Sequence, residues 1–323
     1  SLRLPPRNKH GLMTHRSRVV ASLGLSAALM ATVGSTGTAA QSTPLASRIV
    51  ATDASAYRQL TAVHAGAGNM AFAGLLDRGA VGPHFNFLHR GEIPAGSGIG
   101  HHFHNTVEEM FVILNGEAQF TINGRTALLE GPVAVICRTG ESHAILNTGG
   151  ETVQWMNFQV ASLAGVSDAF DLGDDRVGAG VDPVPTFMSA QLERSLIRPA
   201  GRRTPDAAAP PAPTPVMSRR LFAPTAFRSA WAYVDHVLVA PGASTPNDPH
   251  ESVGEAYYVL AGSGTVTVGD ETAPVERWNA VPVSLGETSR FTNSGTEPLE
   301  LLVVGVARDM ETKTAIIQSA ARR

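Results

Sequence analysis

The sequence predicts an all-β protein made of two barrels in tandem, and three features support this prediction. Short apolar runs separated by turn residues recur from Ile93 to Val160, without a long helical pattern. The 32 glycines and 21 prolines, against only 16% charged residues, are typical of a turn-rich β protein. The chain also aligns with itself at one fixed offset, as expected for two copies of one domain.

This internal repeat has an offset of 146 residues, which brings Glu109 onto Glu255 and His104 onto His250. The alignment needs no gap, and it also superimposes turn residues: Gly96 on Gly242, Gly116 on Gly262, Gly140 on Gly286, Asn147 on Asn293 and Gly149 on Gly295. A period of this length excludes a solenoid, whose stacked repeats are far shorter. With 323 residues, the chain has room for two domains of ordinary size.

The N-terminal segment, residues 13–40, has the organisation of a secretory signal. A start at Met13 is followed by two arginines, an apolar stretch from Val19 to Val33 and a run of small residues. We expect cleavage before Gln41, with residues 1–12 lying upstream of the natural start. The mature protein is then secreted or periplasmic and is not held by a membrane after cleavage. A hydrophobic N-terminal helix is the alternative.

The predicted domains follow the repeat. Residues 41–164 form a first barrel with an N-terminal arm, in which residues 53–64 are either a short helix or an extended segment. Residues 165–220 form a linker that is first acidic and then rich in alanine and proline. Residues 221–323 form a second barrel, entered through the run that starts at Trp231.

Strands and hairpins account for most of the first barrel. Residues 69–76 and the alternating segment 84–89 are expected as strands. Seven or so short strands follow as far as residue 160, and the Asn-Gly pairs at 115–116 and 123–124 predict hairpins between them. Two short helices are predicted outside the barrels, one over Phe187–Ile197 from its apolar spacing and one over the tail, residues 308–323.

Four residues form a candidate metal site. His102 and His104 stand two residues apart, so both imidazoles project from one face of a strand. Glu109 begins the next apolar run, and His143 follows a later glycine turn. Three imidazoles and one carboxylate make a mixed nitrogen and oxygen site for one divalent transition metal, such as Fe, Mn, Zn, Ni or Cu. Such a metal polarises a carbonyl or carboxylate, acidifies a bound water or activates O2.

The second copy of the domain keeps only part of this set. Asp248 stands where the first copy has its first histidine, and Ser289 replaces the last one, while His250 and Glu255 are retained. A neutral hydroxyl is a poor substitute for an imidazole as a ligand of these metals. We expect the second site to have lost its metal. The alternative is a weak metal site with the three ligands Asp248, His250 and Glu255.

The spacing of these motifs resembles that of the cupin superfamily. The motifs are Gly96-x5-His102-x-His104-x4-Glu109-x6-Gly116 and Gly140-x2-His143-x3-Asn147, with Arg138 where the second motif usually has proline. The resemblance covers about residues 83–160 and 231–307. It implies two jelly-roll (double-stranded β-helix) barrels in tandem, a bicupin, with a complete metal motif in the first barrel only.

The resemblance extends to two-barrel cupins such as oxalate decarboxylases, quercetin-type dioxygenases and pirin-like proteins. Because an oxalate decarboxylase is expected to bind manganese in both barrels, Ser289 favours a single-metal, dioxygenase-like oxidoreductase acting on a small organic substrate. In such relatives the ligand glutamate doubles as a base, which gives Glu109 a catalytic role. The alternatives are a metal-dependent isomerase, lyase or decarboxylase, and a non-catalytic cupin that binds a sugar or an organic acid.

Charge and the remaining polar residues add smaller expectations. A net charge of −3 gives no electrostatic case for a nucleic-acid partner, and a homo-oligomer remains open. His84 and His89 are expected to be surface or hydrogen-bonded histidines, Glu108 a surface residue and Cys137 a buried side chain. Glu141 is expected in a solvated turn, with a contact to the metal ligand His143 as the alternative.

Overall fold

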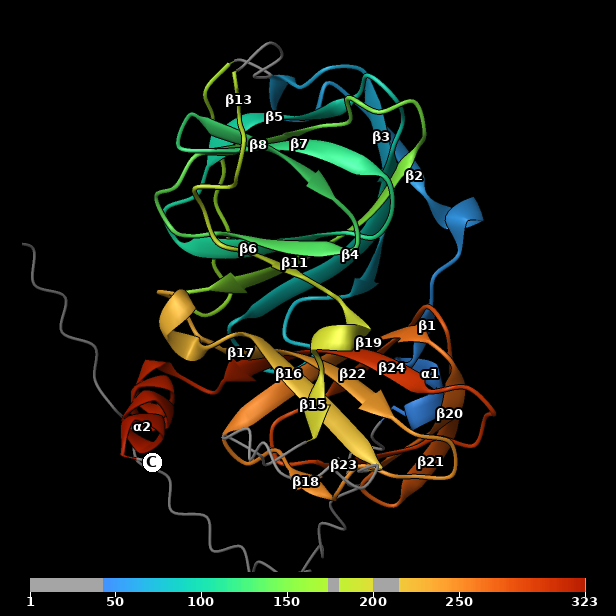
Figure 1. Cartoon of the computed structure of the whole chain (residues 1–323). Helices are drawn as coiled ribbons and strands as arrows, with labels where there is room; N and C mark the ends of the chain where they lie inside the picture. The colour runs from blue at the N-terminus through green and yellow to red at the C-terminus, as the bar shows by residue number, and fades with distance from the viewer. Residues whose placement is uncertain (1–42, 174–179, 200–214, 323) are drawn as a thin grey trace, which may run out of the picture. The chain divides into compact units, whose positions relative to one another are not determined.

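Four β-sheets, paired into two barrels, make up the computed structural model, which describes residues 43–173, 180–199 and 215–322 (Figure 1). The expected signal, its cleavage site and most of the alanine- and proline-rich stretch lie outside the described residues. None of the described helices has the length and apolar character needed to cross a membrane. The prediction of an all-β protein with two tandem barrels is confirmed.

The first barrel pairs a seven-stranded sheet, in the order β14-β9-β6-β11-β4-β3-β2, with a six-stranded sheet, in the order β12-β5-β10-β7-β8-β13. The strand bounds are β2 Arg58–Thr61, β3 Asn69–Leu76, β4 Phe85–Ile93, β5 Gly98–Phe103, β6 Val107–Ile113, β7 Glu117–Ile122, β8 Arg125–Glu130, β9 Val133–Cys137, β10 His143–Leu146, β11 Val153–Ala161, β12 Phe170–Asp171, β13 Val181–Asp182 and β14 Ser189–Gln191. Phe111, Phe120 and Trp155 fill the space between the two sheets. The seven strands expected between residues 93 and 160 are β5 to β11.

The second barrel repeats this plan with a seven-stranded sheet, β1-β22-β19-β24-β17-β16-β15, and a four-stranded sheet, β18-β23-β20-β21. The strand bounds are β1 Val50–Ala51, β15 Arg198–Pro199, β16 Val216–Phe222, β17 Trp231–Val239, β18 Asp248–Pro249, β19 Val253–Ala261, β20 Ser263–Val268, β21 Glu271–Glu276, β22 Asn279–Val283, β23 Thr288–Thr292 and β24 Leu299–Ala307. The helical segments are α1 Leu45–Arg48, α2 Met310–Ala321 and the 3₁₀ turns η1 Ala54–Ala56, η2 Val63–Ala65, η3 Arg194–Leu196 and η4 Pro224–Ala226.

The two seven-stranded sheets share one apolar layer. Leu88, Met110 and Phe158 of the first barrel belong to the same buried cluster as Trp231 and Val304 of the second. Strands that are covered on both faces have nearly continuous hydrophobic sequences. Strand β24 is an example, since it is buried along its whole length. Along β6, alternate residues therefore face either the interior of the first barrel or the second barrel.

The N-terminal arm lies on the second barrel, although it precedes the first barrel in the chain (Figure 1). Strand β1 pairs antiparallel with β22. The backbone N–H of Leu45 donates to Glu271 Oε2 at 2.7 Å, and Arg48 Nη1 donates to Glu287 Oε1 at 2.6 Å. Residues 53–64, left open by the sequence, form η1, β2 and the start of η2.

The segment between the barrels supplies edge strands to both. Strands β12 and β13 pair with β5 and β8, β14 pairs with β9, and β15 pairs with β16. The prediction of a helix over 187–197 is wrong. Of the three apolar residues at helical spacing, Met188, Leu192 and Leu196, only Leu192 is buried, whereas Met188 is 42% and Leu196 39% exposed. Pairing with the free edge of β9 therefore decides the local structure, not the helical spacing.

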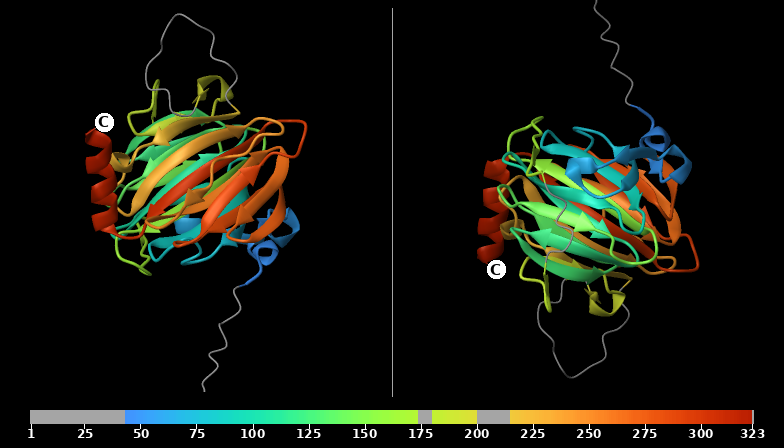
Figure 2. Two further views of the ribbon diagram at one scale, coloured as in Figure 1. Left: turned by 90° about the horizontal axis from the view of Figure 1, so that it is seen from below. Right: turned by 90° about the horizontal axis from the view of Figure 1, so that it is seen from above.

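The tail is helical, as predicted, and forms α2. Asp309 caps its first turn by accepting a hydrogen bond from the backbone N–H of Thr312. The buried Lys313 donates from Nζ to the carbonyl oxygens of Phe227 and Ser229. These bonds hold α2 against the η4 turn, which lies between β16 and β17 (Figure 2).

Candidate metal centre

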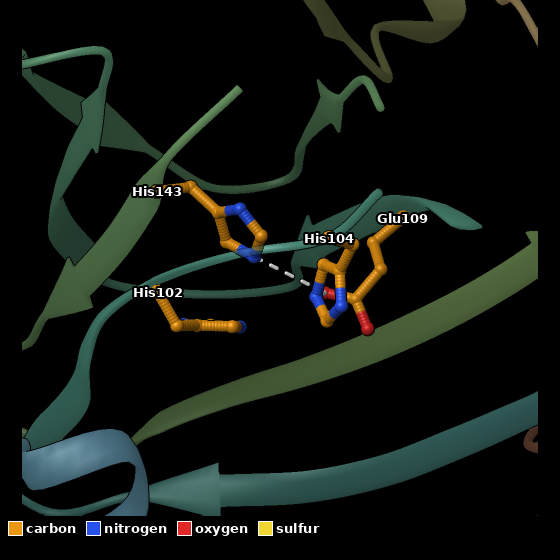
Figure 3. Close-up of side chains that lie close together, drawn as sticks. All are labelled: His102, His104, Glu109 and His143. Carbon is orange, nitrogen blue, oxygen red and sulfur yellow. Dashed lines mark hydrogen bonds and ion pairs between the residues drawn. The ribbon is translucent and has the colours of Figure 1, made fainter. Parts of the chain in front are cut away.

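The four predicted metal ligands come together inside the first barrel (Figure 3). One potential ligand atom from each of His102, His104, Glu109 and His143 lies within 4.8 Å of the other three, and all four side chains are buried. They come from both sheets, because β5 and β10 belong to the six-stranded sheet and β6 to the seven-stranded one. The convergence predicted from the sequence is therefore present.

Strand register explains the convergence. His102 in β5 stands opposite His143, the first residue of β10, in their antiparallel pairing. His104 follows the end of β5 by one residue, on the same face as His102. Glu109 has the same parity on β6 as Phe111, which packs in the barrel interior, so its carboxylate also points inward.

The three imidazoles share one arrangement of hydrogen bonds. In each ring Nδ1 faces a backbone carbonyl oxygen: that of Gly100 at 2.8 Å for His102, that of Asp168 for His104, and that of Glu141 at 3.5 Å for His143. A carbonyl can only accept, so it favours the tautomer with hydrogen on Nδ1. The lone pair is then on Nε2, the atom that faces the site. This donor set fits a divalent transition metal.

Glu109 ties the site together electrostatically. Its Oε2 lies 3.2 Å from Nε2 of His143 and 3.4 Å from Nε2 of His104. Its Oε1 accepts hydrogen bonds from the side-chain amides of Asn157 at 3.0 Å and Gln159 at 2.9 Å. Burial alone would raise the pKa of Glu109, but the two histidines hold it well below the usual value. The carboxylate of Glu109 is therefore an anion held in place by two histidines and two side-chain amides.

The histidines respond differently to the same surroundings. Burial and the neighbouring His143 lower the pKa of His102 to about 2. Burial also disfavours the charged form of His104, but Glu109 outweighs it and raises the pKa of His104 to about 9. Nε2 of His104 is buried and makes no hydrogen bond to the described residues, and its nearest charged neighbour is Glu109 Oε2 at 3.4 Å. A buried polar atom without a hydrogen bond is costly, and a metal ion would be a ligand partner for this nitrogen.

A cavity of about 380 Å³ is lined by three of the four ligands, His102, His104 and Glu109. Its walls are mostly apolar: Leu60, Val63, Met70, Phe72, Phe87, Ile99, Phe111 and Trp155. Among the described residues that line it there is no lysine or arginine. Positive charge for an anionic ligand would therefore come from the metal.

Several residues near the site were not predicted from the sequence. The ring of His64 stacks on His102, with centroids 3.8 Å apart, and its Nδ1 lies 2.5 Å from Asp171 Oδ1. His64 has a φ of 53° in η2, a conformation that is uncommon for a residue other than glycine. His89, expected to be a surface or hydrogen-bonded histidine, is partly buried, lines the cavity and stacks on Phe87, and burial lowers the pKa of His89 to about 4. Nothing in the local sequence marks His64 as a site residue, because long-range folding brings it to the site.

The other polar expectations have mixed outcomes. His84 is hydrogen-bonded as expected, through Nδ1 and the carbonyl oxygen of Ala161 at 3.0 Å, and Cys137 is buried as expected. Glu141 pairs with Arg138 at 2.6 Å, and only its carbonyl oxygen faces His143.

The prediction that Glu108 is a surface residue is wrong. Its side chain is fully buried and accepts hydrogen bonds from the backbone N–H groups of Arg228 and Ser229 and from the hydroxyl of Ser229. It does point away from Glu109, but the second barrel covers the face that it occupies.

In the second barrel the corresponding residues form a different network. Ligand atoms of Asp248, His250 and Glu255 also lie within 4.8 Å of one another, with Asp248 exposed. However, Glu255 accepts hydrogen bonds from the hydroxyls of Tyr233, at 2.6 Å, and Tyr257. Nε2 of His250 lies 2.8 Å from the hydroxyl oxygen of Ser289. Glu255 thus contacts two tyrosine hydroxyls and has one imidazole nearby, with Nδ1 of His250 3.4 Å from its Oε2, and burial raises the pKa of Glu255 to about 7.

Comparisons with known proteins agree with this architecture. The Cupin domain family matches residues 89–159 and 235–305. An oxalate-binding protein of Thermotoga maritima is 30% identical over 98 residues, which cover 30% of this chain and 81% of that protein.

Two solved structures share the two-barrel fold at low identity. The oxalate decarboxylase of Lactobacillus farciminis in complex with formate aligns with a TM-score of 0.57 and 14% identity, over 80% of this chain and 86% of that one. The oxalate decarboxylase of Bacillus subtilis, studied for its Mn(II) centres, aligns with a TM-score of 0.52 and 16% identity, over 80% and 77%.

Proposed function

Because this chain belongs to the cupin family as a two-barrel member, we propose that its first barrel binds a divalent transition metal and uses it to hold a small organic acid. Three histidines and one glutamate are typical of metal binding in cupins. The observation that carries the proposal is the orientation of the imidazoles, each with Nδ1 at a backbone carbonyl and Nε2 facing the site. Manganese, which the related oxalate decarboxylase contains, is among the metals that suit these ligands.

The cavity supports an acid of oxalate size as the ligand. When bound, the metal supplies positive charge that polarises a ligated carboxylate. No lysine or arginine among the described lining residues competes for that carboxylate, and Phe72, Phe111 and Trp155 form apolar walls of the cavity. The relative from Thermotoga maritima is named for binding oxalate. This favours the organic-acid alternative over the dioxygenase that the second-barrel serine first suggested.

The residues around the ligands have positioning roles in this proposal. Asn157 and Gln159 hold one oxygen of Glu109 and leave the other facing the metal position. With both oxygens engaged, Glu109 is better placed as a ligand than as a free base. Asp171 orients His64 against His102 at the cavity wall.

A second candidate function is decarboxylation of the bound acid, a lyase reaction. His64 lines the cavity and is oriented by a carboxylate, as expected of a group that transfers protons. For oxalate, the bond between the two carbons would break and release CO2. The remaining carbon would then take up one proton to give formate, without a net change in oxidation state.

Calorimetry with metal-loaded and chelator-stripped protein tests the proposal. We expect oxalate to bind the loaded protein and to lose most of its affinity after stripping or in the His102→Ala variant. The matched second-barrel variant, Asp248→Ala, should bind oxalate like the wild type. Equal binding by the stripped protein would contradict the proposal. A coupled assay for formate separates turnover from binding. Uptake of O2 with an aromatic substrate would instead support a dioxygenase function.

A further inference from the structure

A second cavity, of about 660 Å³, lies between the two barrels and shares no lining residue with the cavity at the metal centre. Arg90 and Gln154 line it from the first barrel, and Tyr258 and Trp278 from the second. We propose that this cavity binds a planar aromatic carboxylate. This inference is independent of the function proposed for the metal centre.

Arg90 gives the cavity its affinity for an anion. It lies on β4, and its side chain is only 4% exposed. Its Nη1 donates hydrogen bonds to the carbonyl oxygens of Gly91 at 2.7 Å and Trp155 at 3.2 Å, while its buried Nε has no hydrogen-bond partner. No carboxylate of the described residues forms an ion pair with it. A buried cation is costly unless it is paired, and a carboxylate ligand in the cavity would pair with it.

The acidic residues near the cavity are engaged elsewhere or lie at its rim. Glu92, two residues along β4, accepts a hydrogen bond from the amide of Gln154 at 3.1 Å. Glu300 pairs with Arg194 and, at 2.6 Å, with Nε2 of His236. Glu297 is exposed. The charge of Arg90 is therefore not neutralised by a neighbouring carboxylate and is available to an anionic ligand in the cavity.

Trp278 gives the cavity a flat apolar surface. It is 43% exposed, whereas the other two tryptophans are at most 2% exposed. Its φ of 76° is strained for a bulky residue, and hydrogen bonds from its N–H to Val259 O, at 2.7 Å, and from Thr52 N–H to its carbonyl oxygen, at 3.0 Å, hold it there. The guanidinium of Arg277 lies over the indole, 4.6 Å from its centroid. Strain that keeps a large ring exposed at a cavity rim points to a stacking role.

The ligand class follows from these two features together. The volume of 660 Å³ is in the range of small-molecule sites. A carboxylate satisfies Arg90, and an aromatic ring stacks on Trp278 beside the second cation, Arg277. A neutral ring would leave Arg90 unpaired, and an aliphatic acid would not use the indole.

Isothermal titration of the full, metal-loaded chain with 2-naphthoate tests the inference, with 2-naphthamide as the neutral analogue of the same shape. We expect one 2-naphthoate per chain, at least about tenfold tighter than the amide. Trp278→Ala should weaken 2-naphthoate binding about tenfold or more, and Trp278→Phe, which keeps a ring, should weaken it less. Arg90→Gln should bring the acid and the amide to similar affinity. If Arg90→Gln does not fold by circular dichroism, Trp278→Ala, at an exposed position, decides the result.

Two controls locate the site. Arg308→Gln, which removes an exposed arginine outside the cavity lining, should leave binding unchanged, and so should His102→Ala in the metal centre. Loss of binding in His102→Ala would place the acid in the first barrel and overturn the inference. Equal affinity for acid and amide, wild-type affinity in Trp278→Ala, or no binding at millimolar 2-naphthoate would each overturn it as well.

Discussion

Replacing Glu108 with alanine should be one of the most damaging single changes to folding, although this residue touches neither cavity. Three donors converge on its carboxylate: the N–H of Arg228 at 2.8 Å, the N–H of Ser229 at 2.7 Å and the hydroxyl of Ser229 at 2.6 Å. The side chain of Ser229 is fully buried, so water does not replace the lost acceptor. Each buried donor left unsatisfied costs about 1–3 kcal/mol, so the two buried donors of Ser229 give about 2–6 kcal/mol, and the N–H of Arg228, an exposed residue, adds less.

Glu108→Gln separates charge from shape in the same experiment. Its remaining oxygen can still accept from both groups of Ser229, while its amide nitrogen faces the N–H of Arg228. We expect a loss of about 1–2 kcal/mol for this variant. Urea unfolding followed by circular dichroism measures both changes, and Glu141→Ala is the control, since a partly exposed ion pair contributes under about 1 kcal/mol. A Glu108→Ala protein within 1 kcal/mol of the wild type would refute the reasoning.

Three more predictions follow from the two barrels. Elemental analysis should find about one equivalent of metal per chain in the wild type and in Asp248→Ala, and much less in His102→Ala. At a metal concentration 100-fold above Kd, the loss of the metal should lower the free energy of unfolding of His102→Ala by about 2.7 kcal/mol. Equal loss of metal in both variants would contradict the expected difference between the two barrels. Because burial raises the pKa of Glu255 from 4.5 to about 7, its ionisation is easier in the unfolded chain, so the free energy of unfolding should fall by up to about 3 kcal/mol as pH rises through that window. Urea unfolding at about pH 5 and pH 8 should show this loss in the wild type and not in Glu255→Gln. A tagged protein started at Met13 should appear outside the cytoplasm with Gln41, or a close neighbour, as its first residue; a full-length cytosolic product would contradict this.

Much of the candidate site could be predicted from the sequence because its ligands lie on regular strands. The spacing of His102 and His104 puts both rings on one side of β5, and the repeat singled out His104 and Glu109 as the two ligands kept in both copies. His64 and Asp171 could not be found in this way. They are 107 residues apart and meet only because β12 pairs with β5 and η2 packs against the same strand.

The two errors in the fold have a common physical origin. Alternation along β6 correctly separates Glu108 from Glu109, but it does not say that the outer face of that sheet is covered by a second barrel. The spacing around Leu192 likewise does not reveal that β9 has a free edge to be paired. Both depend on contacts between segments far apart in the chain, which a local pattern does not contain.

The path of the N-terminal arm has a consequence for how the protein is assembled. The bond from Leu45 to Glu271 joins residues 226 positions apart, so the edge of the second barrel is completed by a segment that precedes the first barrel in the chain. Closing so long a loop is slow, and until it happens the edge of β22 is open to pairing with other chains. A gene fragment that encodes only the second barrel should therefore give an aggregation-prone product, and adding residues 43–51 as a separate peptide should restore its solubility. The two halves descend from one domain pattern, yet they no longer work as interchangeable modules.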